Sequence, residues 1–124
     1  MILPKVSVVI PTLNSERTLR LTLDSIRKQK YNRLKIEVIV VDGGSSDKTK
    51  TIAKKYNCRI IKNDKINQVY AKHLGLLEAS GEYLLYLDSD EVLENRNSLK
   101  IKVSILQDNR NVYAVIPSGY KTPK

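Results

Sequence analysis

The sequence contains no Phe and no Trp, a single Cys, and only five Gly and four Pro among 124 residues. The core must therefore be built from Ile, Leu and Val, with help from some of the seven Tyr. One cysteine excludes an intramolecular disulfide and a cysteine-based zinc site, which suits a reducing cytoplasm. No apolar run approaches the roughly 20 residues that a membrane-spanning helix needs. The N-terminal stretch MILPKVSVVIP lacks the charged start and long apolar run of a signal peptide, so we predict a cytoplasmic protein.

Acidic residues are also scarce, because 13 Asp and Glu stand against 22 Lys and Arg, for a net charge of +9. A solvated, Lys-rich surface explains most such excesses. The alternative is attraction to phosphate on a nucleotide, a nucleic acid or an anionic membrane. The densest basic cluster, RKQKYNRLK at residues 27–35, does not interleave aromatic residues as a surface for single-stranded nucleic acid does. We therefore expect no nucleic-acid partner.

The length suits one domain with a real core, and 41% hydrophobic with 28% charged residues is typical of a globular protein. Short β-branched runs alternate with amphipathic segments along the whole chain. We predict strands at 6–11, 35–42, 59–62, 82–88 and 112–117, and helices at 15–29, 46–57, 66–80 and 97–108. This alternation predicts right-handed βαβ crossovers in a single α/β domain, residues 1–124: a three-layer α/β/α sandwich with a mostly parallel sheet.

Local patterns refine these elements. Asn14 or Ser15 is available to cap the first helix, and Ser46 the second, with Asp47 suited to the positive end of the helix dipole. In the third helix one stripe carries Val69, His73, Leu76 and Leu77, and Gly81 is expected to end it.

Polar and acidic residues follow three of the predicted strands. The first strand ends in PTLN (11–14), the second in DGGSSD (42–47) and the fourth in DSDE (88–91). Asp, Asn and Ser are ordinary turn residues when each is taken alone. In an open parallel sheet, however, ligands bind outside the carboxyl ends of the strands. Together the three segments predict a site at this edge of the sheet.

The run YLLYLDSDE (83–91) concentrates three carboxylates, Asp88, Asp90 and Glu91, at the end of a buried strand. Carboxylates within about 4–6 Å of each other repel unless a cation joins them. Residues i and i+2 of an extended segment point the same way, so Asp88 and Asp90 can converge. Oxygen ligands without His or Cys select a hard divalent cation, Mn²⁺ or Mg²⁺. We predict a metal ion held at Asp88 and Asp90 that in turn holds a diphosphate.

Four segments carry a resemblance to a known family: residues 6–29, residues 36–49, ASGEYLLYLDSDEVL at 79–93, and the helix predicted at 66–80 just before it. In order and spacing they resemble the N-terminal half of family 2 glycosyltransferases with the GT-A fold, across residues 5 to about 95. The resemblance implies a Rossmann-like nucleotide-binding half, and a hexosyltransferase-type enzyme. It implies metal-dependent, inverting transfer from a UDP- or GDP-linked sugar, the donor, to an unidentified acceptor.

The resemblance also assigns roles to single residues. Asp42 would accept a hydrogen bond from the nucleotide base, and Pro11, Thr12 and Asn14 would line the same pocket. Asp88, the first acid of the Asp-x-Asp (D-x-D) match, would lie near the ribose and the metal. Asp90, the second acid, would be the direct metal ligand.

Four positions depart from the family pattern or fit it loosely. Lys72 stands where an Arg is usual; it can neutralise phosphate but lacks the planar fork of Arg. His73 replaces the usual Asn, and a lone His on a helix is more often a packing residue. Gly43 stands where many members carry a second Asp. Glu16 fits the acidic position of the motif, and a first-turn Glu is equally explained by the helix dipole.

An inverting enzyme also needs a base to deprotonate its acceptor. After Glu94 the chain offers only Asp108, inside the predicted fourth helix, and we do not expect it to be a base. Three explanations stay open: the chain is the nucleotide-binding part of a longer enzyme, the acceptor is already anionic, or the chain binds without activity. The acceptor is a saccharide, a lipid or a polyprenyl phosphate. An anionic acceptor would place the protein peripherally at the inner face of the membrane and give its Lys-rich surface a use.

Two other classes compete with this interpretation. A receiver-like interaction module also holds Mg²⁺ with carboxylates at strand ends, but it puts an acidic pair after the first strand, where this chain has Pro11-Thr12. A nucleotidyltransferase usually opens with a Gly-rich loop, and PTLNSER contains no glycine.

Overall fold

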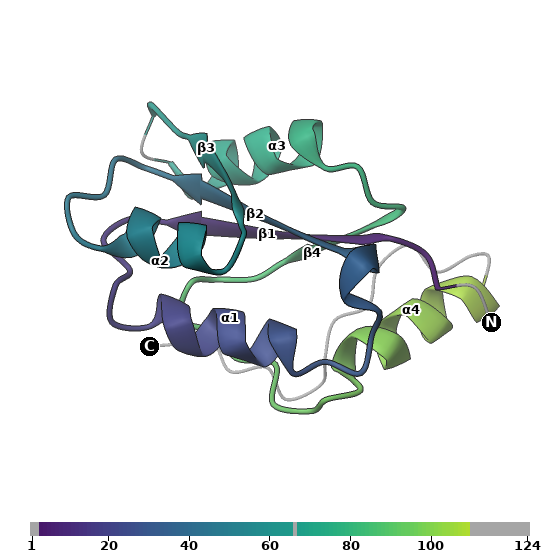
Figure 1. Ribbon diagram of the computed structural model, residues 1–124. Coiled ribbons are helices and arrows are strands. Elements are labelled where there is room, and N and C mark those ends of the chain that lie inside the picture. The colour runs from purple at the N-terminus through teal and green to yellow at the C-terminus, as the bar shows by residue number, and fades with distance from the viewer. Residues whose placement is uncertain (1–2, 66, 110–124) are drawn as a thin grey trace.

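The computed structural model describes residues 3–65 and 67–109 (Figure 1). Its elements run in the order β1 (Val6–Thr12), α1 (Leu19–Arg27), the 3₁₀ turn η1 (Arg33–Lys35), β2 (Ile36–Asp42), α2 (Thr49–Lys55), β3 (Arg59–Lys62), α3 (Gln68–Glu78), β4 (Tyr83–Tyr86) and α4 (Ser98–Asp108). The described strands form one parallel sheet in the order β3-β2-β1-β4. The strand predicted at 112–117 lies outside the described residues. Within them, no helix is both long and apolar enough to cross a bilayer.

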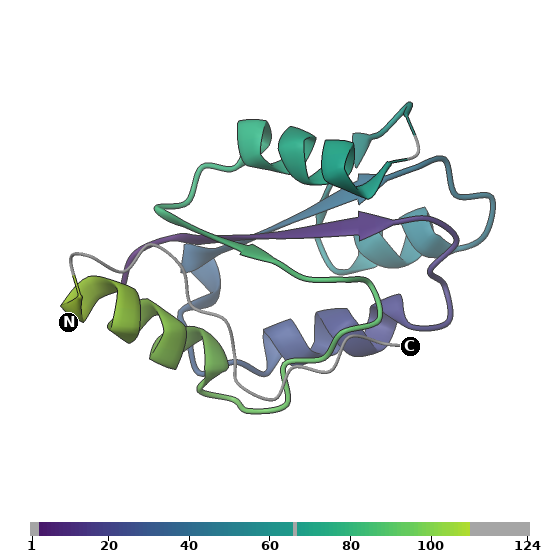
Figure 2. The ribbon, with the colours of Figure 1, turned by 180° about the vertical axis from the view of Figure 1, so that it is seen from behind.

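Helices cover both faces of this sheet, which confirms the predicted three-layer α/β/α sandwich. The helix α3 lies on one face, while α1 and α2 lie on the other with α4 on the same side (Figures 1 and 2). Side chains alternate accordingly along β1, since Val8 and Ile10 join one hydrophobic cluster and Val9 joins the other. This alternation is the period of two that a strand imposes, and it explains why β1 reads as a continuous apolar run.

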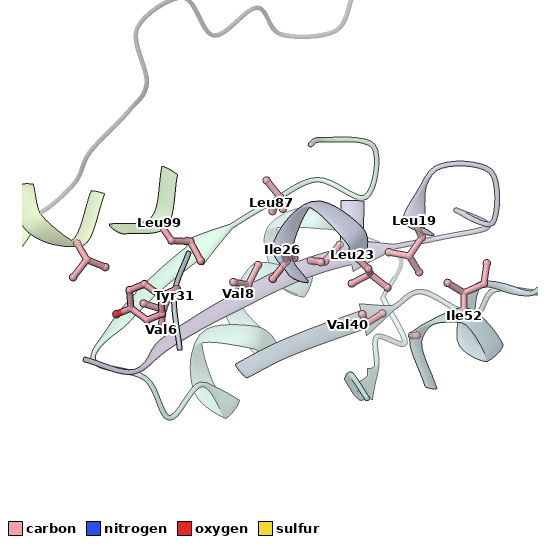
Figure 3. Packing of buried hydrophobic residues seen from close by; sticks show 13 residues of the cluster. Val6, Val8, Leu19, Leu23, Ile26, Tyr31, Val40, Ile52, Leu87 and Leu99 are labelled. Atoms are coloured by element: carbon pink, nitrogen blue, oxygen red, sulfur yellow. The ribbon is translucent and has the colours of Figure 1, made fainter. Parts of the chain in front are cut away.

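The larger cluster lies between the sheet and α1, α2 and α4 (Figure 3). Leu19 and Leu23 of α1 are at most 1% exposed, and Leu99 of α4 packs with them beside Leu87. Full burial of such a side chain stabilises the fold by about 1.5–3 kcal/mol. The cluster therefore fixes α1 and α4 against the same face of the sheet.

The third helix buries a different side from the one that its sequence predicts. Val69, Leu76 and Leu77 are 78%, 53% and 67% exposed, so the apolar stripe of the sequence faces solvent. The buried residues are Ala71 and Gly75. A Cβ atom built on Gly75 would lie 2.2 Å from Cγ1 of Val9, so α3 approaches β1 more closely than a larger residue would permit.

The first helix begins later than predicted, at Leu19. Neither Asn14 nor Ser15 caps it with a side chain: Asn14 has a left-handed φ of 48°, and the Ser15 carbonyl oxygen accepts hydrogen bonds from the backbone N–H groups of Thr18 and Leu19. The loop before α1 therefore continues to residue 18. Since Glu16 lies in this loop, its carboxylate does not belong to the first helical turn as expected.

Two other predicted end signals also differ from the structure. Asp47, not Ser46, accepts a hydrogen bond from the backbone N–H of Thr49 at the start of α2, at 2.9 Å. The helix α3 ends at Glu78, before Gly81. Gly81 serves packing instead, because a Cβ there would lie 2.7 Å from the backbone nitrogen of Ser7.

The order of the strands creates a crevice at one end of the sheet. The chain proceeds from β1 to β2 and β3 in one direction, and β4 then pairs with the other side of β1. Connections from β1 and β4 therefore leave the sheet at a topological switch point, which is where ligands bind in open α/β sheets.

Candidate functional site

The turn after β2 is organised by the buried carboxylate of Asp42. Its Oδ1 accepts hydrogen bonds from the hydroxyls of Thr12 and Ser45 at 2.8 and 2.5 Å. Its Oδ2 accepts hydrogen bonds from the backbone N–H groups of Gly44 and Ser45 at 3.1 and 2.8 Å. Burial alone would raise the pKa of Asp42, but the hydrogen bonds, led by those from Ser45, outweigh burial and hold the pKa below its ordinary value. Asp42 therefore joins the ends of β1 and β2 as an anion.

The loop after β1 and the loop after β2 exchange hydrogen bonds in both directions. The backbone N–H of Asn14 donates to the hydroxyl of Ser45 at 2.8 Å, and the Asn14 side-chain oxygen accepts from the backbone N–H of Ser46 at 2.9 Å. Glu16 and Lys48 lie on the same seam, with a contact of 3.5 Å from the Lys48 backbone N–H to the Glu16 carboxylate. We call residues 13–18 and 43–49 the paired loops. They form one wall of the crevice.

The acidic segment after β4 begins with a tight turn. The backbone N–H of Glu91 donates to the Asp88 carbonyl oxygen at 3.0 Å. The Glu91 carboxylate in turn accepts a hydrogen bond from the backbone N–H of Asp88 at 2.9 Å. Glu91 therefore closes the turn, while Asp88 and Asp90 line a cleft.

Two adjoining clefts open at the carboxyl ends of β1 and β4. The first, the amide cleft, has a volume of about 270 Å³, and its lining includes Pro11, Thr12, Gly43, Asn63, Asn67 and Gln68. The second, the acidic cleft, has a volume of about 350 Å³, and its lining includes Pro11, Asn14, Arg17, Gln68, Asp88 and Asp90. Because Pro11, Ser15, Gln68 and Ser89 line both, the two clefts are compartments of one site.

The structure brings most of the predicted site residues to these clefts. Pro11 and Thr12 line the amide cleft, and Asn14, Asp88 and Asp90 line the acidic cleft. Asp42 lies below them, 3% exposed, and lines neither.

Lys72 lies apart from the other predicted residues. It does not line either cleft, and its ammonium nitrogen sits 5.6 Å from the ring centroid of Tyr86. The neighbouring His73 is exposed and does not pack in the interior as expected; its ring lies 6.1 Å from that of Tyr70. Contact of Lys72 with a phosphate stays a prediction.

Sequence reasoning missed several polar residues of the crevice, three of which lie between the end of β3 and the start of α3. Gln68, at the start of α3, lines both clefts, and Asn63 and Asn67 line the amide cleft. Asn67 also accepts hydrogen bonds at its side-chain oxygen from the backbone N–H groups of Val69 and Tyr70. A signal was available, since an Asn before a helical segment is a frequent cap and places that helix end at the edge of the sheet.

The two acids that line the acidic cleft fit a hard divalent cation in part. Across residues 3–65 and 67–109, no three His, Cys, Asp or Glu side chains gather as a metal site. Asp88 and Asp90 alone offer carboxylate oxygens to the acidic cleft. Two carboxylates suit Mg²⁺ or Mn²⁺, which take their remaining ligands from water and substrate phosphates. The donor set thus agrees with an ion that arrives with a diphosphate.

Comparison with known families decides between the open interpretations. The family described as glycosyl transferase family 2 matches residues 7–123. The chain belongs to glycosyltransferase family 2. Its fold is accordingly the GT-A type, and the receiver-like and nucleotidyltransferase alternatives no longer apply.

Members of glycosyltransferase family 2 with known names share this region. Poly(ribitol-phosphate) beta-N-acetylglucosaminyltransferase TarS of Staphylococcus aureus is 32% identical over 115 residues, which are 86% of this chain and 20% of TarS. The structure of TarS 1–349 with UDP-GlcNAc superimposes with a TM-score of 0.77 at 28% identity, covering 97% of this chain and 37% of that one. The mannosyltransferase PcManGT of Pyrobaculum calidifontis, solved with GDP-Man and Mn²⁺, gives a TM-score of 0.77 at 29% identity, covering 83% and 32%.

This family 2 chain spans well under half the length of the relatives that it matches. The matched part holds the paired loops and the acidic segment. Its relatives bind UDP- and GDP-sugars, and one was solved with Mn²⁺.

Proposed function

We propose that this chain binds a nucleoside-diphosphate sugar, UDP- or GDP-linked, as the donor part of a metal-dependent glycosyltransferase that transfers with inversion. One observation carries the proposal: Asp88 and Asp90 line the same cleft as Asn14 and Pro11, which are brought there by different strands. In contrast, Asp42 and Glu91 accept hydrogen bonds within the chain. The acids that face the cleft are therefore the ones suited to a ligand.

The two compartments suggest how the donor lies. The amide cleft offers the Gln68 side chain and the backbone of Pro11 and Thr12, which are groups that hydrogen-bond a nucleoside. The acidic cleft offers the carboxylates for an ion that binds the diphosphate. Asp42 acts first by holding the wall of the amide cleft in shape, and its direct hydrogen bond to a base stays a prediction.

Asp90, with Asp88 beside it, would hold Mn²⁺ or Mg²⁺. When bound, such an ion neutralises the negative charge that develops on the leaving diphosphate. The chain's own part is to fix the donor before transfer: the clefts orient the nucleoside and the diphosphate so that the sugar faces the acceptor.

Calorimetric titration with UDP and GDP, each with Mn²⁺, with Mg²⁺ and with EDTA, tests the proposal. We expect binding that needs the metal, and at least a tenfold loss of affinity in Asp90→Asn. Asp108→Asn is the matched control, because Asp108 is an exposed acid on α4 that lines neither cleft. Binding that is equal with Mn²⁺ and with EDTA would contradict the proposal.

We further propose that residues 1–124 are the donor-binding domain and that the acceptor site and its base lie outside this sequence. The coverage of 13–41% of the matched relatives supports this, and the exposed position of Asp108 agrees with it. A cytoplasmic location with peripheral contact to an anionic membrane belongs to the same proposal. Its support is the exposed basic stretch at 27–35, where Leu34 is 90% exposed between Arg33 and Lys35.

A further inference from the structure

Three polar side chains lie buried along one side of α1 and just beyond its end. Thr22, Ser25 and Gln29 are 0%, 6% and 6% exposed. We call them the polar row. Their spacing of three and four residues puts them on one helical face, next to the apolar face of Leu19, Leu23 and Ile26. Buried polar groups need hydrogen-bond partners, so the partners of these side chains show which part of the chain the row fixes in place.

Each member of the row bonds to the irregular segment between β4 and α4. The Thr22 hydroxyl donates to the Ser89 carbonyl oxygen at 3.0 Å. The Ser25 hydroxyl oxygen accepts from the backbone N–H of Leu93 at 3.0 Å. The Gln29 side chain donates to the Asn95 carbonyl oxygen at 2.9 Å and accepts from the backbone N–H of Leu99 at 3.0 Å.

The segment held in this way contains the two acids of the acidic cleft. Between Tyr86 and Ser98 the chain forms neither helix nor strand, so most of its backbone groups have no ladder to join. Figure 2 shows this segment turning back from the end of β4 along α1. Ser89 is the residue between Asp88 and Asp90, and its own hydroxyl donates to the Ser15 hydroxyl oxygen at 2.9 Å. The backbone on which both acids stand is therefore tied to α1 and to the paired loops.

We propose that Thr22 and Gln29 are positioning residues, which set the place of Asp88 and Asp90 and thereby the affinity of the site for a divalent ion with its diphosphate. This inference rests on the proposed function. Neither residue lines the clefts, so both act through the segment between β4 and α4 that carries the two acids. Partners that orient metal ligands typically change metal affinity or activity by about 10–100-fold when removed.

Thr22→Val is the decisive variant, because Val keeps the β-branched shape and loses only the hydroxyl that reaches Ser89. We expect Mn²⁺-dependent UDP or GDP binding about tenfold weaker than that of the unchanged chain. Thr22→Ser restores the hydroxyl and should recover most of the affinity. Gln29→Leu, which removes the hydrogen bonds to Asn95 and Leu99 at the far end of the row, should act in the same direction.

Ile26→Val is the matched control on the same helix. It removes one methylene group from the apolar face, lowers the melting temperature and leaves every hydrogen bond of the polar row in place. We expect its metal-dependent affinity to stay within twofold at a temperature where all variants are folded. Equal affinities in Thr22→Val and the unchanged chain, or equal losses in Thr22→Val and Ile26→Val, would overturn the inference.

Amide hydrogen exchange separates failure of the inference from failure of the proposed function. If the unchanged chain binds neither UDP nor GDP with any metal ion, the proposed function fails. In that case the row is still tested by exchange of the amides of residues 88–95, expected to be faster in Thr22→Val than in Ile26→Val. Equal exchange in the two variants would overturn the positioning role.

Discussion

At the scale of single residues, the acids around the crevice differ in what they bind. Asp42 is surrounded by four hydrogen-bond donors, and Glu91 accepts from the backbone of its own turn. Asp47 accepts from the backbone and the side chain of Thr49. Asp88 and Asp90 face the acidic cleft instead. The fold therefore uses Asp42, Asp47 and Glu91 to hold its loops and places Asp88 and Asp90 in the lining of the cleft.

Asp42→Asn should lose stability in a way that depends on pH. An Asn side chain cannot accept four hydrogen bonds, so buried donors of Gly44, Ser45 or Thr12 lose a charged acceptor, at a cost of about 3 kcal/mol at pH 7. Because the pKa of Asp42 is lowered by folding, its contribution is complete above the unfolded value of about 3.9 and is lost as pH falls below it. Urea unfolding between pH 7 and pH 2.5 should show the two proteins converge in acid.

Asp64→Asn serves as its control. Asp64 pairs with Lys62 on the surface, 3.4 Å apart with both side chains more than three-quarters exposed, so its loss should change stability by less than about 0.5 kcal/mol. A stability difference for Asp42→Asn that stays constant from pH 7 to pH 2.5 would contradict the role given to the ionised carboxylate.

Sequence reasoning reached these residues unevenly. It placed Pro11, Thr12, Asn14, Asp88 and Asp90 at one edge, and the clefts contain all five. The reason is that strand ends in a parallel sheet share an edge, whatever the loops do. It singled out Asp88 and Asp90 but did not predict the hydrogen bond from the Asp88 backbone N–H to the Glu91 carboxylate, because that contact depends on a turn that only the folded backbone defines.

At the scale of elements, the close approach of α3 to β1 decides which side of that helix is buried. Small residues, Ala71 and Gly75, let the helix axis lie near Val9. A periodic stripe of large apolar residues usually marks the inner face, and here it marks the outer one. Sequence periodicity therefore predicted the helix but not its rotation, because the distance between helix and sheet is a property of their packing.

Gly75→Ala tests this approach by the sign of its effect. In a helix with room, replacing Gly by Ala stabilises by about 1 kcal/mol. Here the new methyl group would lie 2.2 Å from a Val9 carbon, so we expect a loss of about 1–3 kcal/mol in the free energy of unfolding, measured with urea.

The double variant Val9→Ala/Gly75→Ala is the matched test of cause. Removing the two methyl groups of Val9 makes room for the new one, so the two changes together should cost at least about 1 kcal/mol less than the sum of the single changes. Additive changes in the free energy of unfolding, or a stabilising Gly75→Ala, would show that α3 does not pack against Val9 of β1 as closely as described.

At the scale of the whole molecule, the basic residues behind the net charge of +9 differ in whether an acid pairs with them. The ion pairs between side chains in the described part are Arg59–Glu78 and Lys62–Asp64, so the stretch 27–35 contributes to neither. Its charged residues are Arg27, Lys28, Lys30, Arg33 and Lys35, with no acid among them. The order of the elements, the parallel sheet and the edge at which the strand-end residues gather could be predicted from the sequence. Which charged side chains are exposed could not, because exposure depends on how the chain packs.

Arg33→Ser/Lys35→Ser should weaken binding to vesicles of anionic phospholipid. At about 1 kcal/mol for each basic residue near such a surface, the loss is about 30-fold in the partition constant, measured by sedimentation. Lys62→Ser/Lys65→Ser removes the same charge at the β3–α3 connection and is the control. Equal losses in both variants, or no binding of the unchanged chain to anionic vesicles, would contradict a membrane contact at 27–35.

The paired loops have a mechanical consequence. Because backbone donors of each loop reach side chains of the other, neither can fluctuate open while the other stays closed. The side of the crevice formed by the loops after β1 and β2 therefore moves as one unit. On the opposite side of the crevice, Gln68 begins α3 and has no hydrogen bond to either of the paired loops within residues 3–65 and 67–109. A motion that admits a bulky ligand is therefore expected on that side.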